Sequence, residues 1–140
     1  MAVYATVEDM VERFGESELI QLSDRLEPYA RVVVRPVVDA ALADASAEIE
    51  GYVQSRYPLP LSSTPRVLTR ICCDLARKHL HRDRPTDAVA KDAESARQQL
   101  RAIARGELAL EGTAGAPAPA ADVRRSGPDR VFSSDTLAGL

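Results

Sequence analysis

The chain has 140 residues, a formal net charge of −3 and a pI near 5.4. This length is enough for one domain with its own core, and the acidic balance disfavours a general nucleic-acid binder, which usually carries a basic face. No run of about 18 apolar residues predicts a membrane span, and no basic region followed by an apolar stretch predicts a signal peptide, so a cytosolic setting is expected.

Two short helices are predicted at the start of the chain. Thr6 is a good N-cap for a first helix that Gly15 ends, and a second helix is predicted from Glu16 to about Leu26, where Pro28 closes it. The composition supports helices, because the chain is rich in alanine and has no Trp, four Tyr and two Phe.

Residues 29–38 are interpreted as an extended connector, because the β-prone run at 31–34 is too short and isolated to build a sheet. A long third helix is predicted from about Val37 to Arg56, and Pro58 ends it by forcing Tyr57 out of the α region. Gly51 inside this helix costs about 1 kcal/mol relative to alanine, for which a close helix crossing would be one reason. Acidic residues lie largely off the apolar stripe of this helix and form a candidate interface face: Asp39, Asp44, Glu48 and Glu50.

Two helices of medium length are predicted next. Ser63 or Thr64 is expected to cap the fourth, with Pro65 as its first residue. Thr86 or Asp87 is expected to cap the fifth, and Gly106 stands where a C-terminal cap glycine belongs. The predicted buried positions are Leu68, Ile71, Cys72, Leu75, Ala76 and His79 in the fourth helix, and Val89, Ala93, Ala96, Leu100 and Ile103 in the fifth.

The composition changes after residue 111. Residues 112–121, GTAGAPAPAA, are predicted to be a linker. Residues 122–140 mix charges with Val131, Phe132 and Leu137, and we expect them to form an arm that docks on a partner subunit. The predicted fold is therefore all-α, a compact bundle of about five helices over residues 1–111, with an extended C-terminal arm.

No pattern of residues predicts catalysis, a metal site or a cofactor site. Cys72 and Cys73 are interpreted as small buried hydrophobes, and His79 and His81 are two positions apart on a helix, so they point in different directions. A metal or enzyme site built on Cys72, His79 and His81 is an alternative that metal analysis would test. Arg66, Arg70 and Arg77 make the fourth helix the most basic part of the bundle, which suits either an acidic neighbouring subunit or phosphate. A small helical DNA-binding regulator is therefore a second alternative.

A series of collinear motifs resembles a known family. They are Tyr4-Ala5-Thr6-x-x-Asp9-Met10-x-x-Arg13-Phe14-Gly15, Glu18-Leu19-Ile20-x-Leu22-Ser23-Asp24, Ala45-x-x-Glu48-Ile49-x-x-Tyr52-Val53-x-x-Arg56-Tyr57-Pro58-Leu59-Pro60-Leu61, Cys73-Asp74-Leu75-Ala76-Arg77 and Arg130-Val131-Phe132-Ser133-x-Asp135-Thr136-Leu137-x-Gly139. The pattern is similar to that of the small head–tail connector, or adaptor, proteins of Mu-like tailed bacteriophages and prophages.

The resemblance implies a structural subunit of the virion neck, assembled in the host cytoplasm. Such subunits form a ring, commonly of twelve copies, below the portal protein; the ring extends the DNA channel and offers a platform to the next neck or tail-completion protein. Double-stranded DNA would pass without sequence-specific binding, and no enzymatic activity, cofactor or membrane is expected. We expect Arg56 and Tyr57 to hold the structural loop Pro58-Leu59-Pro60-Leu61 rather than to act on a substrate.

Overall fold

The computed structural model describes residues 3–110, and within them the chain folds into five helices without a β-strand. The helices are α1 (Val7–Phe14), α2 (Glu16–Ser23), α3 (Arg35–Val53), α4 (Arg66–His81) and α5 (Asp87–Arg105). The predicted all-α class is confirmed, although α5 has 19 residues and so equals α3 in length. The predicted linker at 112–121 and arm at 122–140 lie outside the described residues.

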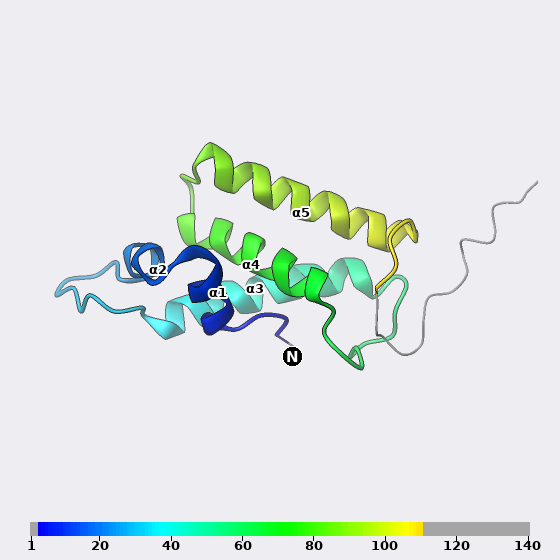
Figure 1. Ribbon diagram of the computed structural model, residues 1–140, viewed down its shortest axis with the longest axis horizontal. Helices are drawn as coiled ribbons and strands as arrows, with labels where there is room; N and C mark the ends of the chain where they lie inside the picture. The colour runs from blue at the N-terminus through cyan, green and yellow to red at the C-terminus, as the bar shows by residue number, and fades with distance from the viewer. Residues whose placement is uncertain (1–2, 111–140) are drawn as a thin grey trace, which may run out of the picture.

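Three long helices form the body of the molecule. Helices α3, α4 and α5 run side by side, and the short α1–α2 hairpin lies across α3 and α4 (Figure 1). Fully buried aliphatic side chains from each long helix meet in the core, among them Leu42, Ile49, Ile71, Leu75 and Leu100. Removal of these apolar side chains from water gives the bundle its main favourable free energy. The opposing cost of desolvation is small, because the core contains few polar groups.

Local side-chain chemistry explains three of the helix ends. Thr6 and Asp9 form a capping box at the start of α1, with Thr6 Oγ1 accepting from the Asp9 amide at 3.1 Å and Asp9 Oδ2 accepting from the Thr6 amide at 2.9 Å. Thr86 caps α5 by accepting from the Val89 amide at 3.2 Å. Gly106 ends α5 in the left-handed region with φ of 81°, as predicted.

Several boundaries differ from the predicted ones. Helix α2 ends three residues early, because the Ser23 hydroxyl donates to the Leu19 carbonyl and accepts from the Val34 amide, which turns the chain back. The cap of α4 is Pro65 rather than Ser63 or Thr64, since its ψ of 147° is extended and its carbonyl accepts the first amides of the helix.

Helix α3 begins at Arg35, two residues before the predicted start, and it ends at Val53 before a turn. The expectation of a close crossing at Gly51 is wrong: the residue is exposed, and a Cβ atom there would meet nothing within 4 Å. None of the helices in residues 3–110 is both long enough and apolar enough to span a membrane.

Candidate functional site

The end of α3 and the end of α5 are joined by a group of contacts that we call the clamp, formed by Arg56, Tyr57, Arg105, Gly106 and Leu110. Tyr57 is only 2% exposed, and its hydroxyl accepts a hydrogen bond from the Leu110 amide at 2.9 Å. The Tyr57 amide donates to the carbonyl of Val53 at 3.0 Å, which continues the last turn of α3. One aromatic side chain therefore fixes the last described residue against the end of α3.

Arg56 forms the second half of the clamp. Its Nη2 donates to the Arg105 carbonyl at 3.1 Å, where the negative end of the α5 dipole favours a cation. The guanidinium also lies directly over Gly106, because a Cβ atom on that glycine would fall 2.6 Å from Cζ and 2.7 Å from Nε of Arg56. The glycine is thus required twice, by its positive φ and by the space that Arg56 occupies.

The proline loop after the clamp is presented outward. Pro58, Leu59 and Pro60 are exposed, while Leu61 is half-buried against the core. A hollow of about 490 Å³ opens beside this loop, lined by residues 63–67 and by Leu108 and Ala109. The clamp therefore ties the start of the α3–α4 loop, at Arg56 and Tyr57, to the end of α5 and to Leu110, the last described residue.

The acidic residues predicted on the third helix do not share one face. Glu48 lies nine positions after Asp39, which places the two about 180° apart around the axis. Asp39 and Asp44 are exposed, but Glu48 accepts two hydrogen bonds from Arg97, at 2.6 and 3.3 Å, and Glu50 accepts one from the Tyr4 hydroxyl at 3.0 Å. The prediction of a single acidic face is corrected by this geometry: two of its members hold other helices or the N-terminal segment in place.

Tyr4, the hydrogen-bond partner of Glu50, is buried. Its pKa is raised well above the usual range by burial first and by its hydrogen bond to Glu50 second. Its amide also donates to the Ser46 hydroxyl on α3 at 3.2 Å. Sequence reasoning missed Tyr4 and Arg97 as structural partners, because a contact between distant residues has no local pattern.

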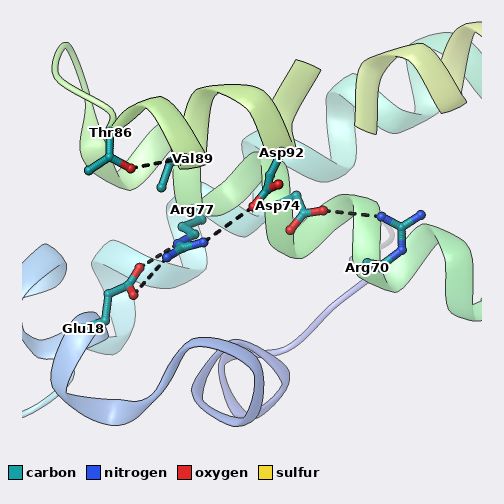
Figure 2. A network of polar contacts seen from close by, with 7 residues as sticks. All are labelled: Glu18, Arg70, Asp74, Arg77, Thr86, Val89 and Asp92. Carbon is teal, nitrogen blue, oxygen red and sulfur yellow. Dashed lines mark hydrogen bonds and ion pairs between the residues drawn. The ribbon is translucent and has the colours of Figure 1, made fainter. Parts of the chain in front are cut away.

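The predicted basic residues of α4 are also largely engaged within the chain. Arg77 makes hydrogen bonds with both carboxylate oxygens of Glu18, at 2.6 and 3.1 Å, and lies 3.9 Å from Asp92 on α5. Its guanidinium carbon is 4.4 Å from the centre of the Phe14 ring. Figure 2 shows Arg77 reaching between Glu18 and Asp92, so that it ties the α1–α2 hairpin and α5 to α4.

The other two arginines differ in their surroundings. Arg70 forms an ion pair with Asp74 at 3.6 Å (Figure 2) and donates to the side chain of Gln99 on α5. Arg66 is exposed and lines a hollow of about 390 Å³ with Asp9, Glu12 and Arg13 of α1. Of the basic positions predicted for an interface, Arg66 is the most accessible. The predicted interface residues of the arm, Val131, Phe132 and Leu137, lie outside the described residues.

The two cysteines are buried, as predicted, and neither forms a disulfide. Burial raises the pKa of both thiols, that of Cys73 to about 12, so they are poor nucleophiles in the folded chain. Cys72 lies 3.5 Å from the Ser46 hydroxyl, and His79 lies 3.9 Å from Glu48. Within residues 3–110, no three His, Cys, Asp or Glu side chains come together in a way that could hold a metal ion.

Comparison with known proteins adds to this geometry. The family model described as "Bacteriophage Mu, Gp36" matches residues 4–126 of the chain. The Mu-like prophage FluMu protein gp36 of Haemophilus influenzae is 36% identical over 110 residues, which cover 79% of this chain and 77% of that protein. Gene product J of Escherichia phage Mu is 38% identical over 86 residues, which cover 61% of this chain and 60% of that protein.

Proposed function

The chain belongs to the Bacteriophage Mu Gp36 family of Mu-like phage and prophage proteins, and on this basis we propose that it is a structural virion protein that connects the head to the tail. In this proposal, copies of the chain form a ring of about twelve below the portal protein, as is common for the head–tail connector proteins that its motifs resemble. The ring extends the DNA channel, and its other surface meets the next neck or tail-completion protein.

The observation that carries the proposal is the clamp. A ring subunit must hold the same shape in every copy, because a small change of angle at one interface accumulates around the ring and prevents closure. Arg56 binds the carbonyl of Arg105 at the end of α5, and Tyr57 binds the amide of Leu110, so the last described residue is tied to the helical body. Both polar side chains bind backbone groups of the same chain and so help to fix the shape of the bundle.

The charge of the chain also supports this role. At a formal net charge of −3 the protein repels a passing DNA duplex more than it binds it, which suits a channel through which DNA must slide. Asp39 and Asp44 are exposed on α3 and are the acidic residues of that helix most accessible to the channel or to an adjacent subunit. The proposed role is structural rather than enzymatic and needs no cofactor.

The DNA-binding regulator remains the competing proposal, and the ion pairs of α4 weigh against it. Arg77 is paired with Glu18 and Arg70 with Asp74, so these side chains would have to give up a protein partner before they bound a phosphate. Binding of duplex DNA by the intact protein that weakens steeply between about 50 and 200 mM salt would favour the regulator instead.

The connector proposal is tested by removing the gene from the phage or prophage that encodes the chain and imaging the particles after induction. We expect DNA-filled or emptied heads together with separate, complete tails, and joined particles again when the intact gene is supplied from a plasmid. Joined infectious particles in the absence of the gene would overturn the proposal.

A further inference from the structure

The end of the bundle opposite the clamp carries an apolar groove. It lies between the α2–α3 loop and the turn after α4, which Figure 1 places together at the end of the molecule away from the α3–α4 loop. The groove has a volume of about 440 Å³ and is lined by Leu26, Pro28, Val34 and Val37, with Arg25 and Arg82 also in its wall. This volume falls within the range of roughly 300–1,000 Å³ that ligand pockets occupy.

The loop that forms one wall has a defined shape. The Asp24 carboxylate accepts from the amides of Ala30 and Arg31 at 3.4 and 2.7 Å, which closes the loop at its base. Arg25 anchors it from the other side, with Nε donating to the Leu22 carbonyl at 2.7 Å and Nη2 to the Leu80 carbonyl at 2.9 Å. The groove is therefore held by hydrogen bonds before any partner arrives.

The same loop exposes apolar side chains. Leu26 is 81% exposed, Tyr29 56% and Val32 53%, and they are three of the five large hydrophobic residues that are exposed within the described part of the chain. Exposed apolar side chains gathered on one short segment usually mark a contact surface.

The groove also carries a local excess of positive charge, because two arginines, Arg25 and Arg82, line it together with one carboxylate, that of Asp24. Burial and the like charge of Arg82 lower the pKa of Arg25, so the two guanidinium groups act on each other. Neither forms an ion pair with a carboxylate among residues 3–110. An occupant that combines apolar side chains with a carboxylate would complement both properties of the groove.

We propose that the groove binds residues 131–137 of an adjacent copy of this chain. This segment, VFSSDTL, places Val131 and Phe132 three to four residues before Asp135, which is the only charged residue among residues 131–140. Val131 and Phe132 supply apolar side chains for the groove, and Asp135 supplies a carboxylate for Arg25 and Arg82. The inference rests on the proposed function in one respect, that copies stand side by side in a ring.

Chain length allows the segment to reach a neighbour. Twenty residues, 111–130, separate Leu110 from Val131 and can span up to about 70 Å when extended. Helix α5, whose length separates Leu110 from the groove end of the same subunit, is about 28 Å long. The clamp at one end of the subunit and the groove at the other would then link successive copies in one direction around the ring.

The proposal is tested by photo-crosslinking in the full-length protein. Phe132 is replaced by benzoylphenylalanine, and equal amounts of ¹⁴N- and ¹⁵N-labelled protein are mixed, assembled and irradiated. We expect crosslinked peptides of mixed isotope composition that join position 132 to residues 26–37. The same photo-reactive residue at Ala114 is the control and should give few crosslinks to that range.

Two results of this experiment would overturn the proposal. Crosslinks confined to chains of one isotope would mean that the segment binds its own subunit, and crosslinks outside the groove would mean that it binds elsewhere. Continued ring formation in either case would leave the proposed function standing, whereas a chain that never forms a ring would count against that function itself.

Charge exchange gives an independent test. Asp135→Arg and Arg82→Glu, made separately in the crosslinking protein, should each lower the yield of groove crosslinks about tenfold, and the two together should restore most of it. Circular dichroism checks that each variant keeps its helix content. Yields that do not change in the single variants, or a double variant no better than either, would contradict the assigned contact.

Discussion

The clamp makes a quantitative prediction about Gly106→Ala. Two costs are expected from the added methyl group. A residue other than glycine at a φ of 81° is strained by about 1 kcal/mol. The new Cβ atom would also lie 2.6 Å from Cζ of Arg56, so the guanidinium must leave its place and lose its hydrogen bond to the Arg105 carbonyl, at about 1 kcal/mol.

The two costs can be separated by a double-mutant cycle. Gly106→Ala should lower the free energy of unfolding by about 2 kcal/mol in the natural chain but by only about 1 kcal/mol when Arg56 is already alanine. The expected coupling energy of about 1 kcal/mol exceeds the scatter of about 0.3–0.5 kcal/mol that is usual for independent sites. Equilibrium urea unfolding followed by helical circular dichroism measures all four proteins.

A matched control comes from Gly51, the glycine inside α3. Gly51 is helical and exposed, and a Cβ atom there meets nothing within 4 Å, so Gly51→Ala should stabilise the protein by about 0.5–1 kcal/mol. Additive effects of the Gly106 and Arg56 substitutions would refute the contact between them. A destabilising Gly51→Ala would refute the packing described for α3.

Three further predictions concern the side chains of Arg77, Cys73 and Tyr4. Arg77→Met should lower the free energy of unfolding by about 1–2 kcal/mol in thermal or urea unfolding, because the ion pair with Glu18 is lost. The control Arg66→Met, at an exposed position, should change it by less than about 0.5 kcal/mol, and equal effects of the two variants would contradict the assigned roles. Burial raises the pKa of the Cys73 thiol to about 12. This thiol should therefore react with iodoacetamide at pH 8.5 at least about a hundredfold more slowly in the folded chain than in the urea-unfolded chain. Comparable rates in the two states would show that the thiol is accessible in the folded chain. Because the pKa of Tyr4 is raised on folding, the unfolded chain loses the phenol proton near pH 10 while the folded chain keeps it. The free energy of unfolding should therefore fall as pH rises above about 10, and Tyr4→Phe should make that fall less steep. An unchanged slope in Tyr4→Phe would exclude the contribution of Tyr4.

Much of the fold could be predicted because it is encoded locally. The apolar positions of the fifth helix recur every three or four residues, and all five predicted positions are buried. Thr6, Thr86 and Gly106 mark helix ends through chemistry that involves only the adjacent turn.

The boundaries that failed depend on contacts between distant residues. Helix α2 was predicted to continue to about Leu26, but the Ser23 hydroxyl binds Val34, eleven residues further on, and this contact has no local signature. The same reason explains the acidic residues of α3. Their spacing showed that they lie off the apolar stripe, whereas the pairing of Glu48 with Arg97 depends on how α5 packs against α3.

The candidate site was found only in part. The Arg56-Tyr57-Pro58 element stood out in the sequence, and both of its polar residues are engaged in the clamp. Their partners, Arg105 and Leu110, are a backbone carbonyl and a backbone amide, and any residue type supplies those groups. Sequence reasoning therefore identified one side of the clamp and had no means of identifying the other.

The proposed place of this protein in the virion is tested most directly by a cryo-electron microscopy reconstruction of the neck of particles that contain it. The account predicts a closed ring of copies of this five-helix fold between the portal and the tail, with the DNA channel through its centre. Density for the fold at another place in the particle, or purified infectious particles that lack the protein, would contradict it.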